Sequence, residues 1–174
     1  MKYFRDQNNI VHAFDDLDPA QVSLMNELTA NWTDITESWP PVQTLAEVQA
    51  VKLAVLSAVA AAAYVAGFSS SATGSALWYD SDKDTQSRIT SAALLSLNET
   101  PFAVLYPNGI TIRAKASQTA NDSTKQQYQH TAAQIFQLAK DMETMISTVQ
   151  TKLWGLQAQV NAATTTDAVN AIAW

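Results

Sequence analysis

Apolar side chains recur at steps of three and four along residues 131–162, which is the spacing of one face of an α-helix. Thr131 and Gln134 form a capping box at the start of this stretch, in which each side chain satisfies a backbone donor of the other residue. The first members of the apolar stripe are Ile135, Leu138, Met142, Met145 and Val149. The pattern predicts one long amphipathic helix, whose stripe has to be covered by another helix, a second copy or another protein.

The stripe of this helix changes register near its middle. It continues after Val149 at Leu153, Leu156 and Val160, which inserts one extra step of four residues. Such a stutter locally unwinds a supercoil. Gly155 lies in the same part, where a glycine indicates a bend or a close contact. We therefore expect two packing partners along the helix, the helix predicted for residues 44–66 at one end and another chain at the other.

The helix predicted for residues 44–66 begins with a second capping box, formed by Thr44 and Glu47, and ends at Gly67. Its apolar positions at helical spacing are Leu45, Val48, Val51, Val55, Val59 and Ala62. The alanines near its end allow close approach of another helix. The fully apolar run of residues 58–66 has nine residues, too few to span a bilayer, so no membrane segment is expected.

Residues 1–16 show the pattern of a β-hairpin, with two β-prone runs on either side of a polar four-residue loop. Residues 19–28 follow as a short helix, which Asp18 caps, and residues 32–36 supply a third strand. Residues 39–41, Trp-Pro-Pro, interrupt regular structure and mark a boundary. The sequence therefore predicts an N-terminal β-rich module over residues 1–40.

The remaining residues, 44–174, are predicted to form a mainly helical domain with one inserted hairpin, which makes the chain α+β. The hairpin covers residues 102–114, because two β-prone runs flank a Pro-Asn-Gly turn there. The other expected parts are a loop over residues 68–75, a helix over residues 85–97, a polar loop over residues 117–129 and a last short helix ending at Trp174.

Composition favours protein partners over nucleic acid. The chain has 174 residues, of which 47% are hydrophobic and only 15% charged, with a net charge of −6. Phosphate contacts need clustered Lys and Arg, whereas the ten basic residues of this chain are scattered. The chain contains no cysteine, which excludes disulfides and thiolate metal sites and fits a reducing cytoplasm.

Candidate catalytic chemistry is sparse. Asp80, Asp82 and Asp84 alternate as at the start of a calcium loop, but a glycine at the sixth position and a glutamate at the twelfth are missing. We expect instead a polar loop whose last aspartate caps the following helix. His12 and His130 have no partner at metal-ligand spacing, and a structural role is favoured for His130. We predict no catalytic, cofactor or metal site; a glycan-cleaving enzyme would have only the three aspartates as acids.

Two parts of the sequence resemble bacteriophage proteins. Residues 1–16, MKYFRDQNNIVHAFDD, followed by Leu28, by residues 33–37 and by the helix start at residues 44–48, resemble the opening of tail-fibre assembly proteins. The second resemblance is to an uncharacterised domain common in phage tail-fibre gene regions. Its motifs are residues 66–70 (AGFSS), Gly74, residues 79–82 (YDSD), residues 130–134 (HTAAQ) and residues 162–174, which open with AATT and end in AIAW.

The resemblance implies a tail-fibre assembly chaperone that binds the fibre protein and assists its folding or trimerisation in the host cytoplasm. The alternative is a structural component of the virion tail or fibre that oligomerises through the long helix. A homo-oligomer or a complex with the fibre protein is expected, without nucleic acid or membrane. The predicted partner-binding residues are Tyr3, Phe4, Phe14, Trp32, Ile135, Leu138, Met142, Met145, Val149, Leu153, Leu156 and Trp174.

Overall fold

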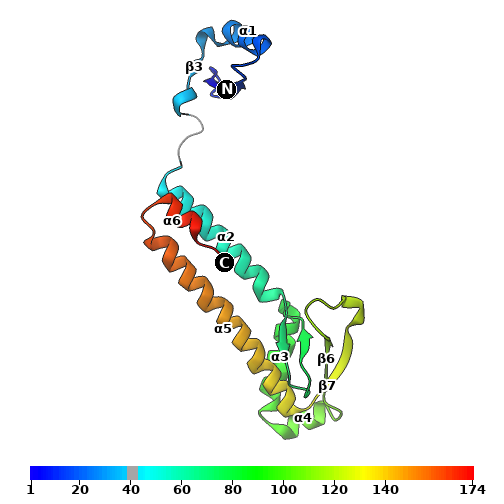
Figure 1. Ribbon diagram of the computed structural model, residues 1–174. Helices are drawn as coiled ribbons and strands as arrows, with labels where there is room; N and C mark the ends of the chain where they lie inside the picture. The colour runs from blue at the N-terminus through cyan, green and yellow to red at the C-terminus, as the bar shows by residue number, and fades with distance from the viewer. Residues whose placement is uncertain (39–42) are drawn as a thin grey trace. The chain divides into compact units, whose positions relative to one another are not determined.

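The computed structural model describes residues 1–38 and 43–174, and the chain divides into two compact units, Met1–Glu47 and Val48–Trp174 (Figure 1). The boundary predicted at residues 39–41 lies outside the described residues. Both units contain strands and helices, so the predicted α+β class is confirmed.

The N-terminal unit is a three-stranded antiparallel sheet with one helix. Its strands are β1 (Lys2–Arg5), β2 (Val11–Phe14) and β3 (Thr33–Asp34), in the order β2-β1-β3, and its helix is α1 (Pro19–Leu28). Short 3-10 turns cover Thr29–Asn31 and Thr36–Ser38. The side chain of Asp18 accepts a hydrogen bond from the Ala20 amide at 2.9 Å and caps α1 as predicted.

Three side chains form the core of this unit, Phe4, Phe14 and Met25, with Val22 and Trp32 packed against them. The rings of Phe4 and Phe14 meet edge to face with centroids 6.1 Å apart. Both phenylalanines are buried, so their prediction as partner-binding residues is wrong. In so small a unit the two large rings are needed inside, because little other apolar volume is available.

The second unit combines a long helical hairpin with a sheet and two shorter helices. Its helices are α2 (Leu45–Val65), α3 (Lys83–Ser96), α4 (Glu99–Leu105), α5 (Ala132–Ala162) and α6 (Thr166–Ala171), and a 3-10 turn covers Asp122–Thr124. Its strands are β4 (Phe68–Ser70), β5 (Leu77–Tyr79), β6 (Ile110–Lys115) and β7 (Gln126–His130). The sheet is antiparallel throughout, in the order β4-β5-β6-β7.

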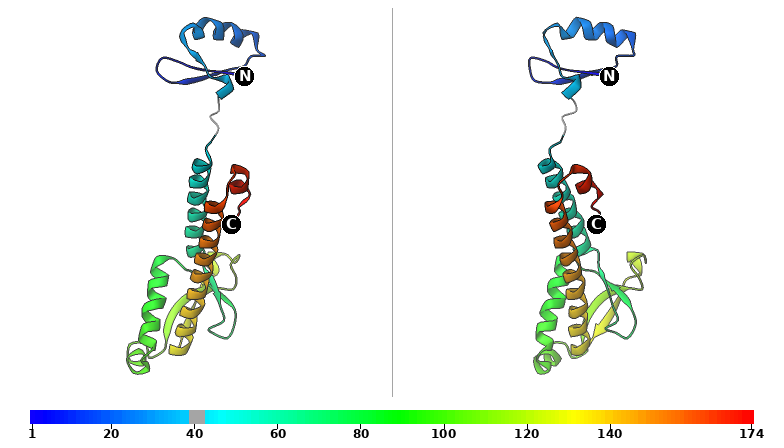
Figure 2. Two further views of the ribbon diagram at one scale, coloured as in Figure 1. Left: turned by 90° about the vertical axis from the view of Figure 1, so that its left-hand side faces the viewer. Right: turned by 60° about the vertical axis from the view of Figure 1, so that its left-hand side comes forward.

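The main core lies between this sheet and the helices α3, α4 and α5. It is made of Phe68, Leu77, Tyr79, Ile89, Ala92, Phe102, Ile110, Ile112, Ala114, Ile135, Leu138 and Met142. Only the first half of α5 contributes to it, and Figure 2 shows α3 running beside that half. The apolar stripe of Ile135, Leu138 and Met142 is therefore covered within the chain.

The second half of α5 packs beside α2, and the two helices run antiparallel (Figures 1 and 2). The Gln49 side chain donates to the carbonyls of Val160 at 3.0 Å and Ala163 at 3.2 Å, and the Tyr64 hydroxyl donates to Gln150 at 2.6 Å. The predicted pairing of the two helices is confirmed. The other end of the α5 stripe packs into the core of the same unit, and another chain as a partner of this helix stays a prediction. The stutter falls where α5 passes from one set of neighbours to the other.

The hairpin predicted at residues 102–114 is wrong. Its first half belongs to α4, and β6 pairs with β7, with Ile110 opposite His130. Pro101 stands in the first turn of α4, where a missing N–H is tolerated, and Phe102 points into the core. The predicted turn at Gly109 is present, with φ of +80°, but it connects the helix α4 to the strand β6.

Two predicted loops contain strands, and the helix α3 is capped by a different aspartate from the one predicted. Residues 68–75 include β4, and residues 117–129 include most of β7. The helix expected from residue 85 begins at Lys83, because Asp82 and not Asp84 caps it. The Asp82 carboxylate accepts from the Asp84 and Thr85 amides, each at 3.0 Å.

Candidate interaction surfaces

The predicted partner-binding stripe of α5 is mostly enclosed. Ile135, Leu138 and Met142 are buried, so their prediction as partner contacts is wrong. The later members are half-buried: Met145, Val149, Leu153 and Leu156. Trp174 is half-buried too, with the Lys152 ammonium 4.9 Å from its ring centre. The stripe thus serves the packing of this chain first, and partner surfaces have to be sought elsewhere.

The outer face of α2 is an uncovered apolar helix face in the described part of the second unit. Val48, Leu56 and Ala60 point inward and are buried. The opposite side carries Val51, Val55, Ala58, Ala62 and Val65, all exposed, which we name the α2 seam. The chain has no charged residue between Lys52 and Asp80. Sequence reasoning missed this face because α2 is apolar on every side, and periodicity cannot then tell inside from outside.

Hydrogen bonds fix which side of α2 faces the rest of the unit. The Lys52 ammonium donates to the carbonyls of Asn170 at 3.2 Å and Ile172 at 3.0 Å. At the end of α2, the Ser81 hydroxyl donates to the Tyr64 carbonyl at 2.7 Å and accepts from the Gly67 amide at 2.8 Å. These bonds turn the α2 seam away from α5 and α6.

The N-terminal unit has an uncovered apolar stripe of its own. Leu24 and Leu28 stand four residues apart on one side of α1, and Leu17 lies just before the cap of this helix. Leu17, Leu24 and Leu28 are 89%, 46% and 44% exposed. We name these three residues the leucine stripe. Beside the core, the Trp32 ring stacks on His12 with centroids 4.5 Å apart. Tyr3 and Trp32, both predicted partner contacts, are half-buried.

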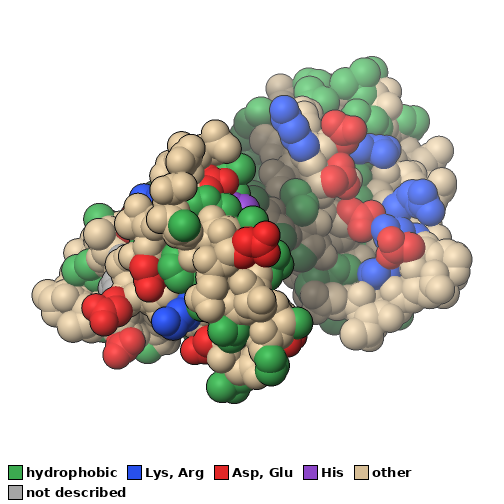
Figure 3. Space-filling view, turned by 90° about the horizontal axis from the view of Figure 1, so that it is seen from above, with side chains coloured by type: hydrophobic (Ala, Val, Ile, Leu, Met, Phe, Trp, Pro, Cys, Tyr) green, Lys and Arg blue, Asp and Glu red, His purple; other side chains and the backbone are tan. Residues whose placement is uncertain are grey.

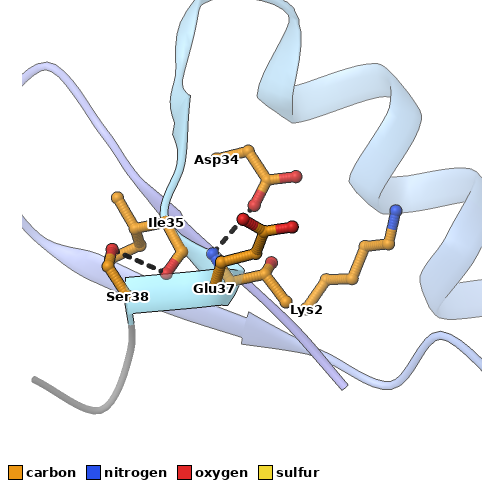
Figure 4. Close-up of a pocket in the computed structure, with 6 residues that line it drawn as sticks. Lys2, Asp34, Ile35, Glu37 and Ser38 are labelled. Atoms are coloured by element: carbon orange, nitrogen blue, oxygen red, sulfur yellow. Dashed lines mark hydrogen bonds between the residues drawn. The ribbon is translucent and has the colours of Figure 1, made fainter. Parts of the chain in front are cut away.

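The open pocket of the N-terminal unit is polar (Figure 4). It has a volume of about 490 Å³ and is lined by Lys2, Asp34, Ile35, Thr36, Glu37 and Ser38. The Asp34 carboxylate accepts from the Thr36 amide at 2.9 Å, and the Ser38 hydroxyl donates to the Ile35 carbonyl at 3.1 Å. A hydrogen bond from the Thr36 side chain, together with the one from the Thr36 amide, lowers the pKa of Asp34, so this carboxylate is an anion at neutral pH.

Asp80, Asp82 and Asp84 have different surroundings in the structure and do not form one site. Asp82 caps α3, and Asp80 forms an ion pair with Lys125 at 2.9 Å, while Asp84 is exposed. Within residues 1–38 and 43–174, no three His, Asp or Glu side chains are grouped as metal ligands. His130 is fully buried, with its ring against Tyr79, and has the structural position predicted for it.

A family of domains of unknown function, DUF4376, matches residues 47–173. The chain belongs to this family. The match covers nearly all of the second unit, including the α2 seam, and leaves out the leucine stripe of α1. No curated protein and no solved structure shows significant similarity to the chain.

The DUF4376 part also contains a helix that is long and apolar enough to cross a membrane. This helix is α2, and only 17% of its most apolar 18-residue window is buried. The helix has 21 residues, whereas the expectation of no membrane segment is based on a fully apolar run of nine. On the face drawn in Figure 3, acidic and basic side chains are interspersed with hydrophobic and uncharged ones.

An apolar groove of the DUF4376 part lies between α3 and α5. It has a volume of about 200 Å³, and its apolar lining includes Leu94, Leu97 and Phe136. All three side chains are exposed. The groove is bordered by Glu143, a charged residue.

Proposed function

We propose that this protein assists the assembly of a bacteriophage tail fibre by binding the fibre protein in the host cytoplasm. The leucine stripe of the N-terminal unit carries the proposal. A unit of fewer than 50 residues has little apolar volume to spare, yet Leu17, Leu24 and Leu28 remain outside its core. The resemblance of residues 1–16 to tail-fibre assembly proteins supports the same assignment.

The mechanism is physical and not catalytic. An unfinished trimeric fibre exposes apolar surface and strand edges, which otherwise lead to aggregation. The leucine stripe covers apolar surface, and β2, an edge strand of its sheet, offers backbone groups for pairing. The acidic net charge of −6 keeps the protein soluble while these surfaces are open.

Co-expression with the tail-fibre protein of the same phage tests the proposal. The intact chain is expected to raise the yield of soluble, trimeric fibre. The triple variant Leu17→Gln, Leu24→Gln, Leu28→Gln is expected to lose this effect, because glutamine removes apolar contact area but keeps the side-chain length. The matched control is Ser23→Gln, Asn26→Gln, which changes exposed polar positions on the same helix.

Two outcomes contradict the proposal. A fibre that folds and trimerises equally well alone removes the need for a chaperone. A triple variant that remains folded by circular dichroism and assists as well as the control shows that the leucine stripe is not the contact.

The second candidate function is a structural component of the virion tail or fibre, which the uncovered α2 seam favours. Mass spectrometry of purified particles separates the two functions. A component is present at a fixed copy number relative to the fibre, whereas a chaperone is absent or present in traces.

A further inference from the structure

The α2 seam has the spacing of a coiled-coil seam. Its five members, Val51, Val55, Ala58, Ala62 and Val65, follow one another at steps of four, three, four and three residues. This alternation is the heptad pattern with which helices pack against each other over several turns. Val51, Val55 and Val65 are 58%, 52% and 55% exposed, so this seam is additional to the packing of α2 on α5.

We propose that copies of this chain assemble with one another through the α2 seam, in a ring of at least three. The heptad pattern is self-complementary, because identical helices around a symmetry axis bring the same positions together. The exposed residues that border the seam include Ala54, Val59 and Ala61, which carry no charge. Identical copies therefore meet without like-charge repulsion. The seam also offers no charged residue that would select a different protein as the partner.

The size of the seam favours a ring over a pair. A helix of 21 residues is about 32 Å long, and one face of it offers on the order of 300 Å². A standard stable interface buries roughly 800 Å² per partner. In a ring of three or more copies each α2 is covered on two sides, which about doubles the buried area. Valines at both kinds of heptad position, such as Val51 and Val55, also favour more than two strands.

A lipid bilayer fits this face less well. The inner side of α2 is bonded through Gln49, Lys52 and Tyr64 to α5 and to the carbonyls near α6. Insertion of α2 would either break these bonds or take α5 into the bilayer. The outer side of the half of α5 that packs beside α2 carries polar residues, with Thr151, Lys152 and Gln159 exposed. Both routes place unpaired polar groups in hydrocarbon.

Light scattering coupled to size-exclusion chromatography tests the assembly on the isolated full chain. The expected mass is three or more times 18.9 kDa. The variant Val55→Glu, Ala62→Glu is expected to run at one chain mass, because carboxylates would face each other around the ring. The matched control, Ala50→Glu, Ser57→Glu, adds the same charges at the same seven-residue spacing but at exposed positions off the seam. Circular dichroism checks that both variants remain helical.

Cysteine cross-linking supplies an independent readout, since the chain has no native cysteine. Ala58 is the middle member of the seam and faces its counterpart whether neighbouring helices run parallel or antiparallel. Ala58→Cys is expected to form chain-to-chain disulfides on mild oxidation, whereas the exposed neighbour Ser57→Cys is not.

Several results would overturn the proposal. A monomeric wild type, or an oligomer that persists in the Val55→Glu, Ala62→Glu variant and lacks the Ala58→Cys cross-link, excludes the seam. A dimer excludes the ring. A chain that is monomeric in buffer but floats with phosphatidylcholine–phosphatidylglycerol vesicles assigns α2 to a membrane. These measurements need no fibre protein, so they are independent of the proposed function.

Discussion

The buried ring of His130 makes the stability of the protein depend on pH. Its Nε2 lies 3.0 Å from the Tyr79 hydroxyl, and its Nδ1 lies 2.9 Å from the Tyr128 carbonyl. The ring is neutral, with Nδ1 donating and Nε2 accepting, because burial lowers the pKa of His130. Burial likewise raises the pKa of Tyr79, which keeps its hydroxyl protonated as the donor.

The unfolded chain takes up a proton on His130 near pH 6.5, whereas the folded chain does so only at lower pH. The free energy of unfolding is therefore expected to fall as the pH drops below about 6.5, by at most about 1.4 kcal/mol per pH unit. Urea unfolding at pH 7.5 and 5.5 measures the loss. His130→Gln is expected to be less stable at pH 7.5 but to show a smaller difference between the two pH values. An equal difference in both proteins would assign the titration to other groups.

The joint between α2 and the sheet depends on one buried hydroxyl. Ser81 is fully buried, and its hydroxyl bonds both the Gly67 amide and the Tyr64 carbonyl. Ser81→Ala leaves a buried amide without its acceptor, so the free energy of unfolding is expected to fall by about 1–3 kcal/mol. Ser87→Ala, at an exposed position of α3, is the control and should change stability by less than about 0.5 kcal/mol. Equal effects of the two changes would show that the joint does not depend on this hydroxyl.

At the scale of the element, two glycines should respond to alanine with opposite sign. Gly155 lies inside α5, and a Cβ there meets nothing within 4 Å, so of the two expected roles, a bend or a close contact, the close contact is wrong. Gly155→Ala is expected to stabilise the protein by up to about 1 kcal/mol through helix propensity. Gly67 has φ of +99°, and a Cβ there would lie 2.4 Å from Trp78 Nε1. Gly67→Ala is therefore expected to destabilise it, and thermal unfolding of both variants checks the signs.

The elements that the sequence predicts correctly carry their own local signals. The capping box of Thr131 and Gln134 and the cap by Asp18 with Pro19 set helix starts that the structure reproduces. The strands β4 and β7 carry no such signal. Phe68 is part of a strand because it pairs with Tyr79 on β5. The polar residues of β7 form a strand because they pair with β6. Pairing partners distant in the sequence decide these segments.

The candidate surfaces could be predicted only in part for a related reason. The stripe of α5 is visible as a pattern, but which neighbour covers it depends on the tertiary fold. The structure places Ile135 and Leu138 in the core of the unit and leaves Val51 and Val55 outside. In α2, apolar residues on all sides hide the orientation, which hydrogen bonds from Gln49 and Lys52 settle.

At the scale of the whole molecule, the two units have separate cores. The N-terminal core is made of Phe4, Phe14 and Met25, and the core between sheet and helices begins at Phe68. The family match begins at residue 47, close to the start of the second unit. A chain built this way can place one contact surface on each unit, and the leucine stripe and the α2 seam lie on different units.

Residues 43–174 are accordingly expected to fold when produced without residues 1–42. The capping box of Thr44 and Glu47 stays intact in this fragment, so α2 keeps its start. Its melting temperature should lie within a few degrees of the transition that the full chain shows for this unit, and its mass should be the same multiple of the fragment mass. Circular dichroism and light scattering measure both. A fragment that is unfolded would show that the second unit depends on the first, and a folded but monomeric fragment would place the assembly contacts in residues 1–42.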